Sequence, residues 1–137
     1  MPGFDWRETM SVGIKEIDDQ HKQLLNTISD LNEAIIKRGV EKDLTDTFYR
    51  LFEYINIHFA TEEKYFDEFH YPDAKTHKAA HEFFTKSVTE MSKKINTDIH
   101  ELSLELVAFL EFWLVGHVLV MDKQYMDCFH NLMQNLY

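Results

Sequence analysis

The sequence predicts an all-α protein, an antiparallel four-helix bundle with up-down-up-down topology. Apolar residues recur every three or four positions along four stretches, the breaks between these stretches are short, and no stretch shows the alternation of a β-strand. Helices joined by short connections become antiparallel neighbours. We expect one domain over residues 1–137, with a short N-terminal arm at about 1–16, the bundle at about 17–122 and a C-terminal tail at about 123–137.

Four amphipathic stripes mark the faces that the expected helices turn inward. Residues three or four apart lie on one face of a helix, so each stripe forms a continuous apolar surface. In chain order, the inward positions are Ile17, His21, Leu24, Ile28, Leu31 and Ile35; Leu44, Phe48, Leu51, Ile55, His58, Glu62, Tyr65 and Phe69; Ala74, His77, His81, Phe84, Val88, Met91 and Ile95; and Ile99, Leu102, Leu106, Phe109, Trp113, His117 and Val120.

Residues that favour helix ends separate the four stripes. Asp73 and Asp98 are predicted N-caps, and Gly39 is a predicted C-cap. Pro72 prevents the second helix from continuing into the third. These positions divide the chain into segments of the length expected for bundle helices.

Composition and charge exclude several classes of protein. The chain has 24 acidic and 14 basic residues, and its formal charge of −10 repels nucleic acid and anionic lipid. It has no uninterrupted run of about 18 apolar residues and no signal-peptide pattern. We therefore expect a soluble, cytoplasmic protein without nucleic-acid or membrane partners. The single cysteine, Cys128, excludes an internal disulfide and any Cys-x-x-Cys site.

Histidines and acidic residues interrupt the apolar stripes at inward positions. One inward histidine is more often a hydrogen-bonded core residue, but here the same departure occurs on all four predicted helices. Imidazole and carboxylate groups are costly to bury unless they are paired or bound to a metal. We interpret His70, His100 and His130 as ordinary residues of helix ends and tail. The predicted metal ligands are His21, His58, Glu62, His77, His81, His117 and Asp122.

This ligand set indicates iron, zinc or manganese, because imidazole and carboxylate without thiolate suit these metals. It also contains enough donors for two metals. Two six-coordinate metals offer about twelve positions; five imidazoles, two bridging carboxylates and one bridging oxygen fill all but one. One open position is enough to bind a small molecule. The Glu-x-x-His pairs of ferritin-like oxidases do not occur in the sequence.

The spacing between His117 and Asp122 does not fit a regular helix. Five residues rotate a side chain about 140° away from its partner on an ideal α-helix, so a kink, a π-bulge or a helix end must return Asp122 to the site. Gly116 precedes His117, where glycine costs about 1 kcal/mol relative to alanine. It either eases this distortion or is a harmless exposed glycine.

Several short motifs resemble the hemerythrin family, and within it the single-domain bacteriohemerythrins, over nearly the whole chain. They are Ser11-Val12-Gly13-Ile14, Ile17-Asp18-Asp19-Gln20-His21-Lys22, His58-Phe59 with Glu62-Glu63, His77-Lys78 with His81, and Trp113-Leu114-Val115 with His117 and Asp122-Lys123. Members of the family often carry Asn and Ile where this chain has Gly116 and Val118.

The resemblance implies a bundle that holds two non-haem irons. Glu62 and Asp122 would bridge them beside an oxo or hydroxo group. His77, His81 and His117 would complete one iron, and the iron of His21 and His58 would stay open to dioxygen. By the same resemblance, an apolar oxygen pocket would be formed by Phe59, Trp113, Leu114 and Val118.

The implied function is reversible dioxygen binding, for storage, delivery or scavenging, rather than enzymatic turnover. Two alternatives remain open: an oxygen or redox sensing module of a signalling system, and a di-iron peroxide or nitric oxide reductase. Dioxygen is the expected ligand, and no protein partner is predicted.

Overall fold

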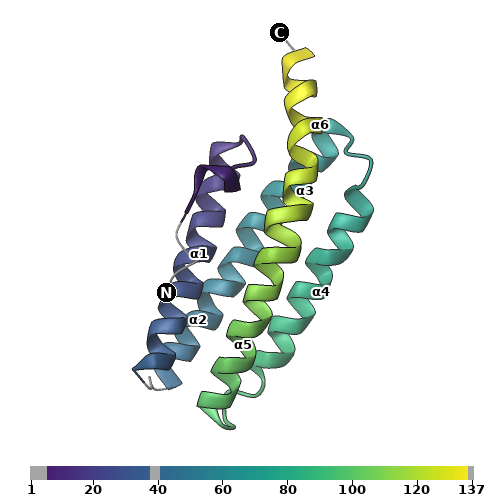
Figure 1. The fold of residues 1–137 in the computed structure, drawn as a ribbon. Coiled ribbons are helices and arrows are strands. Elements are labelled where there is room, and N and C mark those ends of the chain that lie inside the picture. Colours follow the sequence, from purple (N-terminus) through teal and green to yellow (C-terminus); the bar gives the residue numbers. More distant parts are fainter. Residues whose placement is uncertain (1–5, 38–40, 136–137) are drawn as a thin grey trace.

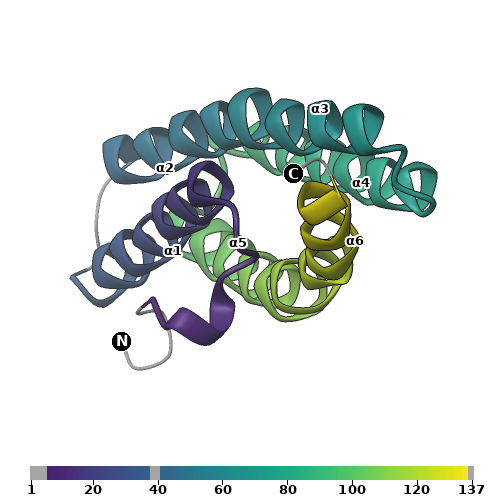
Figure 2. The same cartoon turned by 90° about the horizontal axis from the view of Figure 1, so that it is seen from above.

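A computed structural model describes residues 6–37 and 41–135 of the chain. It confirms the predicted all-α class: four long helical stretches form an antiparallel bundle around a common interior (Figures 1 and 2). The stretches are α1 (Lys15–Ile36); α2 (Glu41–Tyr54) with η2 (Ile55–Phe59) and α3 (Ala60–Phe69); α4 (Ala74–Ser92); and α5 (Ile99–Trp113) with η3 (Leu114–Met121) and α6 (Asp122–Asn135). The N-terminal arm contains a short 3-10 helix, η1 (Glu8–Met10).

The helix ends agree with the sequence analysis in part. Asp98 is the N-cap of α5, where its Oδ1 atom accepts a hydrogen bond from the Glu101 backbone N–H at 3.0 Å. Asp73 is the N-cap residue of α4, as predicted, but its side chain makes no capping hydrogen bond. The α3 helix ends at His70, which adopts a left-handed conformation with a φ of 52°. Gly39 lies outside the described residues.

Two apolar clusters fill the bundle. The larger one contains side chains of all four stretches, among them Leu24, Leu51, Phe84 and Leu106. The smaller one joins the N-terminal arm and the start of α1 to α3 and α6, through Val12, Ile14, Ile17, Phe66, Tyr71, Tyr125 and Phe129. The bundle therefore has an apolar core in each of two regions along its length.

The smaller cluster includes side chains of α6, because the fourth stretch continues through Asp122 to Asn135 as one helix (Figure 1). Tyr125 and Phe129 are at most 1% exposed. The expected boundary between bundle and tail near residue 122 is therefore not a break in the structure.

The fourth stretch is apolar on more than its inward side. By length and composition alone, Ile99–Met126 is long and apolar enough to cross a membrane, and an 18-residue window within it has a mean hydropathy of 1.9. Its inward side chains, however, include the buried His117 and Asp122, and it packs against α1 and α4. We interpret the stretch as a core helix of the bundle.

Two π-helical segments, η2 and η3, interrupt the second and fourth stretches. A π-helical turn contains more residues than an α-helical turn, so it shifts the inward face relative to a regular helix. Val120, which was predicted to face inward, is 51% exposed, so this prediction was wrong. Ile55 and Tyr65 are partly buried and pack against the two apolar clusters, while their neighbours Tyr54 and Phe66 are buried.

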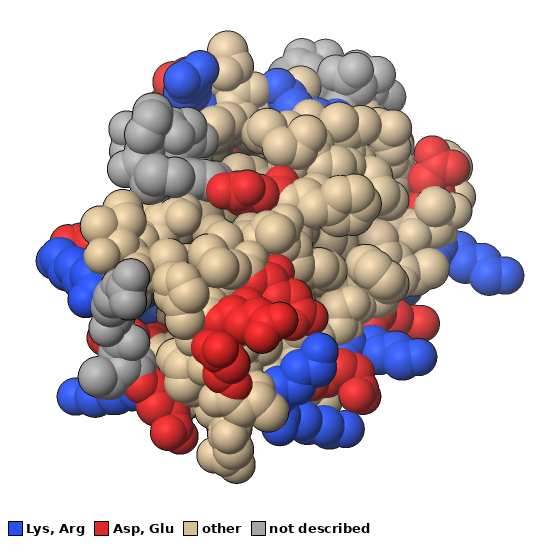
Figure 3. All heavy atoms as spheres, turned by 60° about the horizontal axis from the view of Figure 1, so that its bottom comes forward, with Lys and Arg blue, Asp and Glu red and all other residues tan. Residues whose placement is uncertain are grey.

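The surface reflects the acidic composition. On the face shown in Figure 3, acidic side chains gather beside separate basic ones. This pattern agrees with the formal charge of −10. It gives this face no continuous basic surface of the kind that binds nucleic acid.

Candidate metal centre

All seven predicted ligand side chains meet in the interior of the bundle. Each is at most 2% exposed. They come from all four helical stretches: His21 from α1, His58 from η2, Glu62 from α3, His77 and His81 from α4, His117 from η3 and Asp122 from the start of α6. Their donor atoms form two groups that could each hold a metal ion, one of Glu62, His77, His81 and His117 and one of His21, His58, Glu62 and Asp122.

The Asp122 carboxylate lies between histidines of both groups. Its Oδ1 atom is 2.8 Å from His77 Nε2 and 2.9 Å from His117 Nε2. Its Oδ2 atom is 2.9 Å from His21 Nε2. The two oxygens of one carboxylate therefore face different groups, which is the arrangement that a bridging ligand requires.

Glu62 also contacts both groups. Its Oε1 atom is 3.0 Å from His58 Nε2 and 3.1 Å from His81 Nε2, and its Oε2 atom is 3.8 Å from His77 Nε2. Glu62 and Asp122 together thus connect the three-histidine group of His77, His81 and His117 with the two-histidine group of His21 and His58.

Several of these close contacts are not hydrogen bonds. His58 Nε2, His77 Nε2, His117 Nε2 and Asp122 Oδ1 are buried without a hydrogen-bond partner, although each lies within 3.0 Å of an oxygen or nitrogen of the cluster. A buried polar atom without a partner costs about 1–3 kcal/mol. Donors bound to one metal at about 2.1 Å and at right angles lie about 3 Å apart. The spacing and the unpaired atoms therefore fit a metal centre.

The second nitrogen of His58 is held by an outer hydrogen-bond chain. Thr61 donates its hydroxyl to the Ile57 carbonyl at 2.8 Å, so it accepts from the Gln20 amide N–H at 3.1 Å. This fixes the Gln20 oxygen toward His58 Nδ1, at 2.6 Å. His58 therefore donates from Nδ1 and turns Nε2 toward Glu62, as metal-binding histidines commonly do.

His81 has a similar outer partner. Its Nδ1 atom lies 3.1 Å from Glu63 Oε2, and its Nε2 atom faces Glu62. Gln20 and Glu63 were not predicted as supporting residues. Both are direct neighbours of predicted ligands, but their hydrogen-bond partners lie on other helices, so only the fold reveals the contacts.

The carboxylates keep their charge in the interior. Burial and the charge of Asp122 both raise the pKa of Glu62, but contacts with His58 and His81 outweigh them and lower it to about 2. Burial also raises the pKa of Asp122, yet its close contacts with the histidines, that with His117 foremost, hold it well below its usual range. Both groups are therefore ionised at neutral pH and attract a cation.

The proton balance of the cluster also favours metal binding. Burial lowers the pKa of His58, but the charge of Glu62 and close contacts with Asp122 and Glu62 raise it to about 9. In the metal-free protein, a proton on His58 offsets part of the carboxylate charge. A bound metal would replace this proton, because only an unprotonated nitrogen can be a ligand.

Aromatic rings cover the three-histidine group. Phe59 stacks on His81 with ring centroids 3.8 Å apart, and Trp113 stacks on His117 at the same distance. Both aromatic residues belong to the predicted oxygen pocket. The other two predicted pocket residues are also buried in the larger apolar cluster: Leu114 and Val118.

A tyrosine covers the two-histidine group. The Tyr54 ring stacks on His58 with centroids 4.7 Å apart, and its hydroxyl accepts a hydrogen bond from Trp113 Nε1 at 3.3 Å. Burial, followed by the charges of Asp122 and Glu62, raises the pKa of Tyr54 well above its usual value, so the phenol keeps its proton. Tyr54 was not predicted, because the inward stripe was assigned to Ile55, although Tyr54 also lies on this face, three residues after Leu51 and four before His58.

Comparison with known proteins identifies the family. Residues 12–129 match the family described as "Hemerythrin HHE cation binding domain". The chain belongs to the hemerythrin family. The bacteriohemerythrin of Clostridium acetobutylicum is 30% identical over 129 residues, which cover 90% of this chain and 99% of the relative. The bacteriohemerythrin of Stenotrophomonas maltophilia is 31% identical over 124 residues, which cover 89% and 78%.

A more distant relative is the hemerythrin-like protein of Naegleria gruberi, 26% identical over 122 residues that cover 89% of this chain and 90% of the relative. Hemerythrin domains bind non-haem iron and oxygen. Family membership thus confirms the predicted resemblance, and it agrees with the buried cluster of histidines and carboxylates.

The η3 segment provides the distortion that the His117 to Asp122 spacing required. Its i to i+5 geometry brings residues five apart onto one face, and His117 Nε2 lies 2.9 Å from Asp122 Oδ1. Gly116 lies within η3 and is exposed, and a methyl group added there would meet no atom within 4 Å. Any effect of alanine at this position would therefore act through the backbone.

We predict that Gly116→Ala stabilises the iron-free fold by about 1 kcal/mol but weakens iron retention, because alanine favours a regular α-helix over the π-helical turn. Melting temperature of the iron-free protein and the rate of iron loss to a chelator measure the two effects. Ala108→Gly, the reverse change at an exposed position of α5, should lower stability without this selective effect on iron. A gain in both stability and iron retention would reject a role of Gly116 in the distortion.

Proposed function

We propose that this protein binds dioxygen reversibly at a non-haem di-iron centre, for oxygen storage, delivery or scavenging, and that it is not an enzyme. We further infer that residues 1–137 contain one soluble, cytoplasmic domain. The proposed iron ligands are His21, His58, Glu62, His77, His81, His117 and Asp122.

The unequal number of histidines in the two groups carries this proposal. The three-histidine group has three imidazoles and the two-histidine group has two, and both carboxylates contact both groups. With a shared oxygen bridge, one iron would have six ligands and the other five. The remaining position, on the side of His21 and His58, is suited to one small molecule. Bound iron would supply the electrons that hold dioxygen there.

The protein's own residues support binding rather than turnover. A peroxide or nitric oxide reductase requires a source of protons at the centre. Among the described residues, the buried phenols of Tyr54 and Tyr125 lie near the carboxylates, but burial raises the pKa of both well above the usual value. They are therefore poor acids at neutral pH. The lack of a good acid among these phenols therefore favours an oxygen-binding function over a reductase function.

We predict two irons per purified chain. His58→Ala and Glu62→Ala should each lower iron content and melting temperature together, because they remove a ligand and leave buried charge unpaired. Metal analysis and thermal unfolding measure both quantities. His100→Gln is the control, since His100 is exposed and should leave iron content unchanged. One zinc per chain, or equal iron loss in all three variants, would contradict the ligand assignment.

We predict that adding dioxygen to the reduced protein produces a visible absorption band that disappears when the gas is removed. The reason is that reversible binding changes the electronic state of the irons without consuming the ligand. An optical titration through several cycles of oxygenation and degassing measures this. A band that never reverses, or steady consumption of oxygen, would favour turnover over reversible binding.

We predict that Leu114→Ala lowers stability by about 2–5 kcal/mol and speeds oxidation of the oxygenated protein, because a truncated pocket wall admits water. Leu106→Ala is the matched control. Leu106 is fully buried in the same cluster but lies eight residues, or about 12 Å, earlier along the helix. It should lose similar stability without faster oxidation. Equal decay rates in parent and Leu114→Ala protein would exclude the pocket role of Leu114.

A further inference from the structure

The Tyr54 hydroxyl accepts a hydrogen bond but donates none to the described part of the protein. The side chain is 8% exposed, and its oxygen accepts a hydrogen bond from Trp113 Nε1. Among residues 6–37 and 41–135, no acceptor receives the phenol's own proton. Buried donors almost always have a partner, so an unused donor in this position calls for an explanation.

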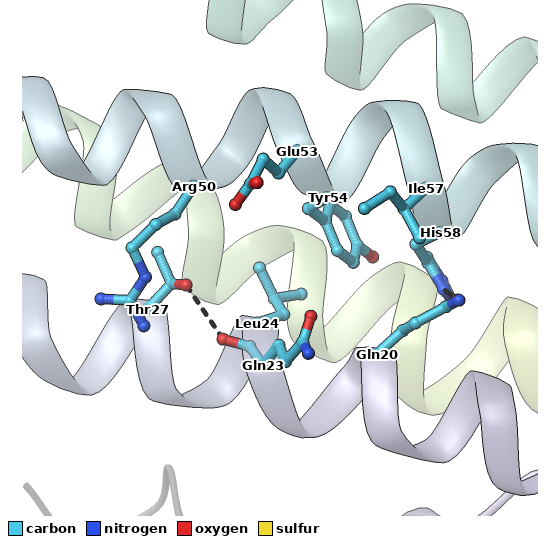
Figure 4. Close-up of a pocket in the computed structure, with 9 residues that line it drawn as sticks. All are labelled: Gln20, Gln23, Leu24, Thr27, Arg50, Glu53, Tyr54, Ile57 and His58. Carbon is cyan, nitrogen blue, oxygen red and sulfur yellow. Dashed lines mark hydrogen bonds between the residues drawn. The ribbon is translucent and has the colours of Figure 1, made fainter.

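The position of this donor relates it to the metal centre. The Tyr54 ring stacks on His58, and the Trp113 ring that donates to its hydroxyl stacks on His117. Figure 4 shows the hydroxyl on the side of the ring that faces His58. Because the Tyr54 hydroxyl oxygen accepts a hydrogen bond from Trp113 Nε1, the hydroxyl proton points away from Trp113. The donor therefore lies beside the two-histidine group.

A small cavity meets the same tyrosine. It has a volume of about 50 Å³ and lies between α1 and the α2–η2 stretch (Figure 4). Gln20, Tyr54 and His58 line its inner part, and the exposed Gln23 and Glu53 line its outer part. Because a cavity of about 10–15 Å³ already holds a water molecule, this one has room for a small polar ligand.

We propose that Tyr54 donates a hydrogen bond to a small ligand held on the two-histidine side of the centre, so that it favours ligands whose outer atom accepts a hydrogen bond. Azide is a suitable probe of this class. The inference deepens the proposed function and rests on it. Tyr54 adds one polar group to a pocket that the sequence predicted to be apolar. The hydrogen bond from Trp113 makes the phenol a better donor, because linked hydrogen bonds polarise one another.

The competing explanation is structural. In that case, the hydroxyl serves only as an acceptor for Trp113. Tyr54→Phe distinguishes the two, because it keeps the aromatic ring on His58 and removes only the hydroxyl. A structural role predicts a lower melting temperature without any change in ligand binding.

The experiment measures azide binding to the oxidised di-iron protein. We expect the Tyr54→Phe protein to bind azide at least 10-fold more weakly than the parent, because a hydrogen bond to a charged acceptor is lost. The infrared band of bound azide should shift in D2O for the parent and not for the variant. Tyr71→Phe is the control: Tyr71 is also buried, but it packs in the smaller apolar cluster and should change neither result.

Equal azide affinity in parent and Tyr54→Phe protein would overturn the proposal, and so would a parent band that is insensitive to D2O. An azide band of the parent that is insensitive to D2O would overturn the proposal even if the Tyr54→Phe protein loses iron. A parent that holds two irons but binds neither azide nor dioxygen would instead contradict the proposed function itself, and the role of Tyr54 with it.

Discussion

The burial of two ionised carboxylates among five imidazoles is the constraint on which the rest of the structure depends. Glu62 and Asp122 are fully buried, and charge is costly in a protein interior unless it is balanced. In the metal-free protein a proton on His58 offsets part of this charge and metal ions would replace that proton, so metal binding and folding share one free energy. The bundle surrounds this polar layer with an apolar cluster on either side.

The helices depart from regular geometry where they supply ligands. The η2 segment contains His58, and η3 contains His117 and ends beside Asp122. π-Helical turns are rare in proteins and occur frequently at functional sites, so these segments need a compensating interaction. Contacts within the cluster can supply it, because they hold His117 against Asp122. The irregular backbone and the polar layer thus occur at the same place.

The second layer around the cluster differs between its two sides. Gln20 supports His58 through a neutral amide, whereas the carboxylate of Glu63 supports His81. Phe59 lies on the three-histidine side, and Tyr54 places a hydroxyl on the two-histidine side. The two ligand groups therefore have different electronic and hydrogen-bonding surroundings, which would suit the proposed centre, in which a small ligand binds on one side only.

The sequence by itself determined the all-α class, the four-helix bundle, the Asp98 cap and the family, because periodicity, capping residues and ligand motifs are local patterns. It also singled out the seven residues that meet in the interior. Only the tertiary structure decided which partners hold the histidines and which aromatic side chain lies on His58. The roles of Gln20, Thr61 and Tyr54 depend on contacts between helices, and the contact of His117 with Asp122 depends on a π-helical turn; a regular period of 3.6 residues contains neither.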